Sequence, residues 1–390
     1  MSKIVYISLL LAALPLMSLK AQDSLSISEE SSNAHTLAFK GQLSAWALYN
    51  GGLDLPVYTG GRYIPQLNYE YNFGNSQKLD FEASLNLNGL MGFNSDSLDH
   101  DGTLKPYRLW ARYSGEQFEI RAGLQKINFG SANMIRPLMW FDGVDPRDPL
   151  NLTDGVWGLL GRYYFLNNAN LWLWVLYGNE NPRGWDLLGS RSDLPEFGGR
   201  FQSPVPRGEA ALSYHHRNSD TQDYTASLPL YDRIPENRIG LDLRFDIFVG
   251  LWAEASWIHS GENLGMYTNQ ELLNLGVDYT FGVGSGLYVV YEQLLASYDT
   301  EAFGLENTFT FSLLSMSYPL GLFGNINAIM YYDWTNKDLY NFLNIGYDFR
   351  HTSLYLMAYA NPTDYNIPTQ QADINLFGGR GIQILLVFNH

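Results

Sequence analysis

The chain has 390 residues, of which 15% are aromatic and only 16% are charged, and its formal net charge is −16. The charged fraction is too low for an ordinary soluble surface, and the acidic balance argues against binding to nucleic acid. Cysteine is absent, which excludes disulfide frameworks, thiolate metal sites and cysteine nucleophiles.

Residues 1–21 are typical of a secretory signal peptide. Lys3 precedes an apolar run, and the small residue Ala21 precedes a polar segment. An N-terminal anchor helix is the alternative, which the shortness of the apolar run disfavours. Residues 22–35 are rich in serine and are predicted to form a flexible periplasmic leader. The folded domain is therefore expected to span residues 36–390.

A two-residue alternation of apolar and polar side chains recurs along the rest of the chain. It is clearest over residues 79–88, where Asp80 and Glu82 alternate with apolar neighbours. Successive side chains of a strand point to opposite faces, so each segment has one apolar and one polar face. After the N-terminus, no apolar run reaches the roughly 18 residues that a membrane-spanning helix needs. The pattern predicts a transmembrane β-barrel with a polar interior.

Eighteen candidate strands follow from this alternation. They span approximately residues 36–49, 62–73, 78–92, 104–113, 117–128, 156–166, 170–178, 197–203, 208–217, 236–247, 251–260, 271–281, 286–296, 306–318, 323–333, 339–349, 353–361 and 380–389. The alternation is weaker near 170–178, 306–318 and 353–361, which leaves sixteen strands as the alternative.

Short and long connections alternate between the candidate strands. Residues 74–77 and 114–116 are short connections, whereas 93–103, 129–155 and 179–196 are longer. Outer-membrane barrels have short periplasmic turns and longer external loops. The predicted fold class is therefore all-β, an antiparallel up-and-down transmembrane barrel with an even number of strands.

These features resemble a Gram-negative outer-membrane porin over essentially the whole mature chain. Residues 121–130, Arg-Ala-Gly-Leu-Gln-Lys-Ile-Asn-Phe-Gly, and 145–149, Asp-Pro-Arg-Asp-Pro, resemble a strand and loop of porin-like families that include alginate-export-type channels. Residues 382–390 resemble the signal read by the barrel-assembly machinery, although Phe388 is third from the end instead of last. The resemblance implies an outer-membrane location in contact with lipid, and it leaves open whether the barrel is a homotrimer.

The longest uninterrupted connection, residues 129–155, is expected to fold into the barrel and narrow it. Its apolar cluster should not be left in water; the members are Met134, Ile135, Leu138, Met139, Trp140 and Phe141. The predicted constriction residues are Arg136, Trp140, Asp142, Asp145, Arg147 and Asp148. The alternatives are that the cluster packs against a neighbouring subunit or lengthens the barrel above the membrane.

Inward-facing arginines lie on successive predicted strands, and most inward acids lie elsewhere. The predicted pore-lining residues are Arg108, Arg112, Arg121, Arg162, Arg200, Asp80, Glu82 and Glu119. A basic wall opposite acidic surfaces would create a field that filters ions by sign. The alternative is that these side chains pair across strands. Inward aromatics such as Trp46 and Trp110 would offer stacking surfaces for sugars, although such residues more often fill space.

The predicted function is passive diffusion of small hydrophilic solutes through a polar lumen, without a cofactor. The 7 histidines are scattered, and the chain has neither a Gly-x-Ser-x-Gly nor a His-Glu-x-x-His motif. We therefore do not expect an enzyme. The alternative function is that of a non-conducting barrel for ligand binding, adhesion or assembly. The solute and the ion selectivity are not decided by the sequence.

Overall fold

The computed structural model describes residues 35–222, 228–363 and 376–390. The predicted signal peptide and all of the predicted leader except His35 lie outside the described residues. Among the residues that are described, no helix is long and apolar enough to cross a membrane.

The described part of the chain forms eighteen β-strands. They are β1 (His35–Asn50), β2 (Val57–Gly74), β3 (Gln77–Phe93), β4 (Leu98–Ser114), β5 (Phe118–Gln125), β6 (Val156–Tyr164), β7 (Asn170–Leu176), β8 (Glu196–Val205), β9 (Gly208–Ser219), β10 (Ile234–Asp246), β11 (Gly250–Ser260), β12 (Asn269–Phe281), β13 (Leu287–Asp299), β14 (Asn307–Leu320), β15 (Gly324–Asp333), β16 (Asp338–Asp348), β17 (Thr352–Ala360) and β18 (Arg380–Asn389). A short 3-10 helix, η1 (Gly265–Thr268), precedes β12. The predicted strand number is confirmed, and the alternative of sixteen is wrong.

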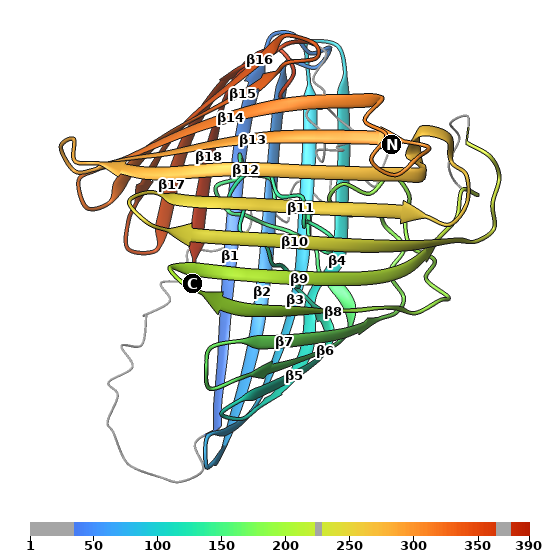
Figure 1. Ribbon diagram of the computed structural model, residues 1–390. Helices are drawn as coiled ribbons and strands as arrows, with labels where there is room; N and C mark the ends of the chain where they lie inside the picture. Colours follow the sequence, from blue (N-terminus) through green and yellow to red (C-terminus); the bar gives the residue numbers. More distant parts are fainter. Residues whose placement is uncertain (1–34, 223–227, 364–375) are drawn as a thin grey trace, which may run out of the picture. The chain divides into compact units, whose positions relative to one another are not determined.

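The strands form one closed antiparallel sheet (Figure 1). Each strand pairs with its neighbours in sequence, and β1 also pairs with β18. This seam runs from the Gln42–Asn389 pair to the Asn50–Gly381 pair. Closure leaves no open sheet edge, so the backbone groups are paired within the sheet, as a lipid environment requires. The predicted up-and-down barrel is confirmed.

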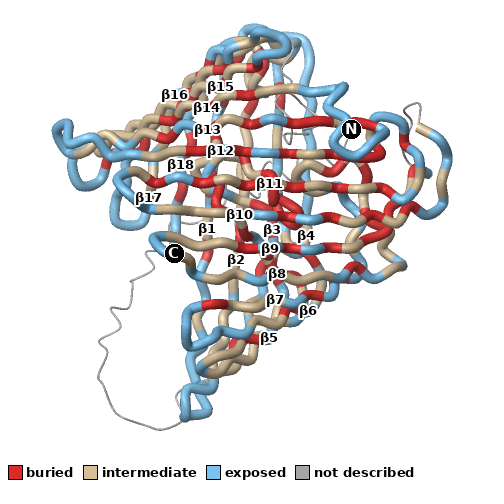
Figure 2. The backbone as a smooth tube through the Cα atoms, viewed as in Figure 1, coloured by how far each residue is buried: buried red, intermediate tan, exposed pale blue. Residues whose placement is uncertain are grey.

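The two faces of the sheet differ in polarity. On β10, Arg238 and Asp242 are buried, whereas Ile239 and Leu241 are 43% and 44% exposed. Figure 2 shows buried and exposed residues alternating along the strands. Exposed aliphatic residues at alternate positions are typical of a lipid-facing outer surface, with polar residues directed into the barrel.

One predicted connection, residues 93–103, is wrong. β4 begins at Leu98 and pairs with β3 as far as Phe93, so that only residues 94–97 connect the two strands. The added part of β4 contains Asp99 and Asp101, and both of its faces are exposed. The alternation of apolar and polar residues is therefore missing there, although the backbone ladder continues.

The start of β2 also lies earlier than predicted, at Val57 instead of residue 62. Gly60 and Gly61 interrupt the alternation because they have no side chain. The ring of Trp46 on the paired strand β1 occupies the space beside Gly60, where an added Cβ would collide with it. Glycine at this position therefore marks a close side-chain approach within the sheet.

Candidate functional site

The segment between β5 and β6, residues 126–155, contains much of the predicted site and is called the long loop below. Its apolar side chains are buried: Leu138, Trp140 and Phe141 are 1–2% exposed. They pack in one cluster with Trp174 of β7. Burying a large apolar side chain contributes about 1.5–3 kcal/mol, so this cluster stabilises the long loop against β6 and β7.

Two buried carboxylates of other strands bind the first part of the long loop. Glu254 of β11 accepts hydrogen bonds from the backbone N–H groups of Ala132 (2.8 Å) and Leu138 (2.7 Å). Glu292 of β13 accepts hydrogen bonds from the N–H groups of residues 133–135 at 2.6 to 3.2 Å. Both oxygens of each carboxylate accept a loop N–H group, so each side chain holds two or more backbone positions. The position of the long loop therefore depends on these two side chains.

Neither carboxylate has a cationic partner in an ion pair. Within the described residues, no Lys or Arg nitrogen lies within 4.0 Å of the Glu254 or Glu292 oxygens. A buried charge is costly unless it is paired or hydrogen-bonded, so the loop N–H groups stabilise both carboxylates. Gly130 allows the close approach, because it has a φ of 114° and an added Cβ would collide with the Glu254 carboxylate.

Further polar contacts extend this attachment to neighbouring strands. Trp140 Nε1 donates a hydrogen bond to Ser256 Oγ of β11 (3.0 Å). Ser131 Oγ donates to Asp242 of β10 (3.0 Å), and the Asn274 amide of β12 donates to a backbone carbonyl oxygen of the loop. The first half of the long loop therefore lies against inward-facing residues of β10–β13.

The segment between β7 and β8, residues 177–195, contacts the long loop and is called the second loop. Trp185 Nε1 donates a hydrogen bond to the backbone oxygen of Arg136 (2.8 Å). Gly184, with a φ of 53°, lies so close to Met139 that an added Cβ would collide with the Met139 backbone oxygen. The second loop therefore helps to position the long loop.

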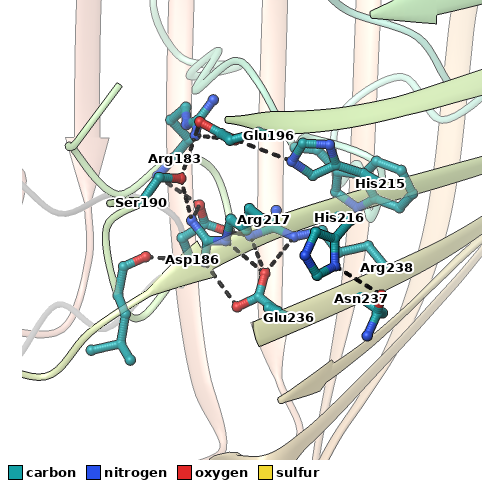
Figure 3. Close-up of polar contacts among 12 residues, drawn as sticks. Arg183, Asp186, Ser190, Glu196, His215, His216, Arg217, Glu236, Asn237 and Arg238 are labelled. Carbon is teal, nitrogen blue, oxygen red and sulfur yellow. Dashed lines mark hydrogen bonds and ion pairs between the residues drawn. The ribbon is translucent and has the colours of Figure 1, made fainter. Parts of the chain in front are cut away.

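A buried ion network joins the second loop to β9 and β10 (Figure 3). Asp186 of the second loop pairs with Arg217 of β9 (2.8 Å) and with Arg238 of β10 (2.7 Å). Glu236 of β10 pairs with the same two arginines at 2.7 and 2.6 Å. Both arginines are 1% exposed. Removing one member of a buried ion pair leaves an uncompensated charge. Moving Asp186 away from the two arginines would have this cost, so the network holds the second loop in place.

The ion network continues to Glu196 at the start of β8. Glu196 pairs with Arg183 of the second loop (3.0 Å), and it lies 3.1 Å from His215 Nε2. Trp174 Nε1 donates a hydrogen bond to His215 Nδ1 (3.1 Å), so in the neutral ring the proton is on Nε2 and is donated to Glu196. This histidine therefore links the network to the apolar cluster of the long loop.

Gly184→Ala is expected to loosen the contact between the two loops, because the new methyl group would collide with the Met139 oxygen. Gly178→Ala is the matched control, since Gly178 also has a positive φ (78°) but an added Cβ meets nothing within 4 Å. Both variants have the left-handed backbone penalty of about 1–2 kcal/mol. Proteolysis of the long loop in detergent should be faster in Gly184→Ala alone; equal rates in both variants would contradict this role.

Three of the five predicted arginines form one cluster with two predicted acids. Arg112 pairs with Asp80 (2.6 Å) and Glu119 (3.4 Å), and Glu119 also pairs with Arg121 (2.9 Å) and Arg162 (3.5 Å). The strand register explains the cluster, because Arg112 lies opposite Asp80 on one side and Arg121 on the other. These charges partly neutralise one another. Pairing across strands is the alternative to a basic wall that the sequence left open.

The other predicted pore-lining residues are not part of these ion pairs. Arg108 of β4 donates a hydrogen bond to the backbone oxygen of Thr153 in the long loop (2.8 Å). Arg200 of β8 pairs with Asp242 of β10. Glu82 is directed inward on β3 and forms no ion pair within the described residues. Arg108 and Arg121 both act electrostatically on Glu82, whereas Arg200 pairs with a different part of the barrel.

The predicted constriction residues pair mainly with one another. Arg136 pairs with Asp142 (2.8 Å), and Arg147 pairs with Asp145 (2.6 Å). Asp148 accepts hydrogen bonds from two backbone N–H groups of the loop (2.9 and 3.2 Å). Burial raises the pKa of Asp148 above its ordinary value, and these two hydrogen bonds act in the opposite direction. The charges of the long loop are thus largely balanced within the loop itself.

Two cavities of about 370 Å³ each lie beside residues 144–150 of the long loop. One is bounded by β15–β17, and the other by β1–β4, β17 and β18. Their strand walls contain the amide residues Asn88, Asn325, Asn327, Asn344 and Gln383. None of these amides was among the predicted site residues, although their places in the inward set of alternating positions could have identified them.

No family model matches the chain, and no curated protein matches it. Several solved structures are similar in fold. OccK7 (OpdD) of Pseudomonas aeruginosa is 11% identical over 91% of this chain and 98% of that one, with a TM-score of 0.53. OccK5 (OpdH) of the same organism is 12% identical over 91% and 97%, also with a TM-score of 0.53. OmpT of Vibrio cholerae, an outer-membrane protein in trimer form, is 10% identical over 92% and 100%, with a TM-score of 0.51.

At these identities the similarity concerns the fold alone. The chain has the fold of Gram-negative outer-membrane porins, which confirms the resemblance seen in the sequence. The apolar outer face of the barrel supports the predicted outer-membrane location.

Proposed function

We propose that this protein is a passive outer-membrane channel for small hydrophilic solutes, narrowed by the long loop. The observation that carries the proposal is the attachment of the long loop to Glu254 and Glu292 on one side of the barrel, with two cavities on its other side. The proposed solute path runs between residues 144–150 and the walls formed by β15–β18 and β1–β4. Its width is set by the segment 144–150, because this segment borders both cavities.

Recording from the purified full chain in a planar bilayer tests this function. Stable ion-conducting steps are expected, with heat-denatured protein as the control. A correctly folded barrel that stays silent would contradict the channel function and would favour a barrel for ligand binding, adhesion or assembly. No chemical conversion of the solute forms part of the proposal.

The charged lumen gives a separate prediction. Replacing Arg108, Arg112 and Arg121 by glutamine should shift the ion selectivity toward cations, because the Asp80 and Glu119 carboxylates lose positive neighbours. The reversal potential in a KCl gradient measures this shift. Arg191→Gln is the control, since this arginine forms an exposed pair with an aspartate of the same loop. An unchanged reversal potential in the triple variant would show that these three arginines do not determine the ion selectivity.

Assembly is a further part of the proposal. Insertion by the barrel-assembly machinery is supported by the resemblance of residues 382–390 to its signal, and β18 forms the seam with β1. A homotrimer in contact with outer-membrane lipid is proposed by analogy with the trimer form of OmpT. The mass of the protein in native detergent complexes, measured before and after heating, distinguishes a trimer from a single barrel.

A further inference from the structure

The strand walls of the two cavities contain five amide side chains. Asn325 and Asn327 lie on β15, Asn344 on β16 and Gln383 on β18, and strands β15–β18 contribute no charged side chain to either lining. A side-chain amide has both donors and acceptors. It can therefore bind a hydroxyl group either as donor or as acceptor, without selecting for charge.

The charges that do line the cavities are balanced. The arginines are Arg62, Arg136 and Arg147, and the acids are Asp101, Asp145 and Asp148. Two of these arginines are in ion pairs of 2.8 and 2.6 Å within the long loop. A paired charge offers little net attraction to an ionic solute, so the linings favour neither anions nor cations.

Two amide oxygens on these walls have no donor. Asn344 Oδ1 and Gln383 Oε1 are buried and have no hydrogen-bond partner in the described protein. A buried acceptor without a partner is costly, and because both side chains line a cavity, rotation of the amide toward the cavity would let a solute hydroxyl group satisfy it. Nearby, Phe342, Tyr359 and Phe377 form an aromatic cluster with ring centroids 5.2 to 6.3 Å apart. The Arg147 guanidinium carbon lies 5.2 and 4.4 Å from the centroids of Phe342 and Phe377. The rest of the aromatic cluster supplies apolar surface beside these polar groups.

We propose that the path past these cavities selects uncharged, polyhydroxylated solutes of the size of a single sugar ring. This inference rests on the proposed channel function and adds the class of solute. A volume of about 370 Å³ for each cavity suits a small molecule. An organic anion is the competing solute, because Arg62 forms no ion pair with any described residue.

Uptake into proteoliposomes that contain the full chain tests the solute class. Glucose, gluconate and glucosamine are nearly equal in size and differ in charge, and glucose is expected to enter fastest. Faster entry of gluconate or of glucosamine would overturn the inference in favour of an anion or a cation. If ion current is present but glucose has no advantage, only the solute class is wrong. If the folded protein passes neither ions nor any of the three solutes, the channel function itself is wrong.

The amide wall is tested with the double variant Asn344→Leu, Gln383→Leu. Its glucose uptake should fall by roughly fivefold for each hydrogen bond lost, while its KCl conductance shows that the barrel is folded and open. Gln42→Leu is the matched control, because Gln42 pairs with Asn389 on β18 and lines neither cavity. Asn344→Ser retains a polar group and should lose less. A conducting double variant with wild-type glucose uptake would overturn the inference.

Discussion

Replacing Glu254 and Glu292 together by glutamine is expected to raise the single-channel conductance and to add current noise. Glutamine keeps the side-chain shape but replaces one acceptor oxygen by an NH2 group, which cannot accept a hydrogen bond from the N–H groups of residues 132–138. A buried group left without its hydrogen-bond partner costs about 1–3 kcal/mol, so the attachment weakens substantially. Both ends of the long loop lie at one end of the barrel, where β5 ends and β6 begins, so a detached loop can withdraw in that direction.

The matched control for this result is Glu209→Gln. Glu209 is a partly buried acid near the start of β9 that binds the Gln202 side chain, and it has no contact with the long loop. Its replacement should leave the conductance at the wild-type value. A double variant of Glu254 and Glu292 with wild-type conductance and noise would show that the two carboxylates do not control the width of the path.

Replacing Arg217 by leucine is expected to destabilise the folded barrel by about 3–5 kcal/mol, because breaking a buried ion pair leaves a charge without its partner. Among the described residues, Asp186 and Glu236 would each keep one ion-pair partner, Arg238. Urea-induced unfolding in lipid vesicles, followed by tryptophan fluorescence, measures the change in the free energy of unfolding. The second loop should also loosen, since Asp186 belongs to it.

Two comparisons test whether the burial of the ion network causes this effect. Arg191→Gln breaks an exposed pair with Asp193 and a hydrogen bond to the Asp232 backbone oxygen, and it should lower the free energy of unfolding by no more than about 1 kcal/mol. Arg217→Met combined with Glu236→Met removes both charges of one pair, and should cost less than the single replacement of Arg217. If the buried and the exposed replacements have equal effects, the ion network does not anchor the second loop.

The strands could be predicted from the sequence because lipid and water impose opposite requirements on alternate residues. On β10, for example, Arg238 and Asp242 face inward and Ile239 and Leu241 face outward, so the alternation is unbroken. The predicted strand boundaries were wrong at positions where the two faces do not have to differ in polarity. At Gly60 a neighbouring tryptophan fills the space, and at the start of β4 neither face is buried.

The site was predicted only in part. The sequence places Glu254 and Glu292 on inward positions, but their partners are backbone N–H groups of the long loop, which have no residue-type signature. The pairing of Arg112 with Asp80 depends on the register between β3 and β4, and that register includes an irregularity at Ser84. Apolar residues of the long loop were easier to predict, because the hydrophobic effect requires only that they be buried.

The narrowing of the path by the long loop is tested most directly by locking the loop in place. The chain has no cysteine, so Ala132→Cys and Val290→Cys, which pack in one buried cluster with Trp252, add the only thiols. These changes are combined with Glu254→Gln and Glu292→Gln, and the single-channel conductance is measured before and after oxidation. A raised conductance that returns to the wild-type value when the disulfide forms is the predicted result. The same conductance in the reduced and the cross-linked protein would contradict the role of the long loop.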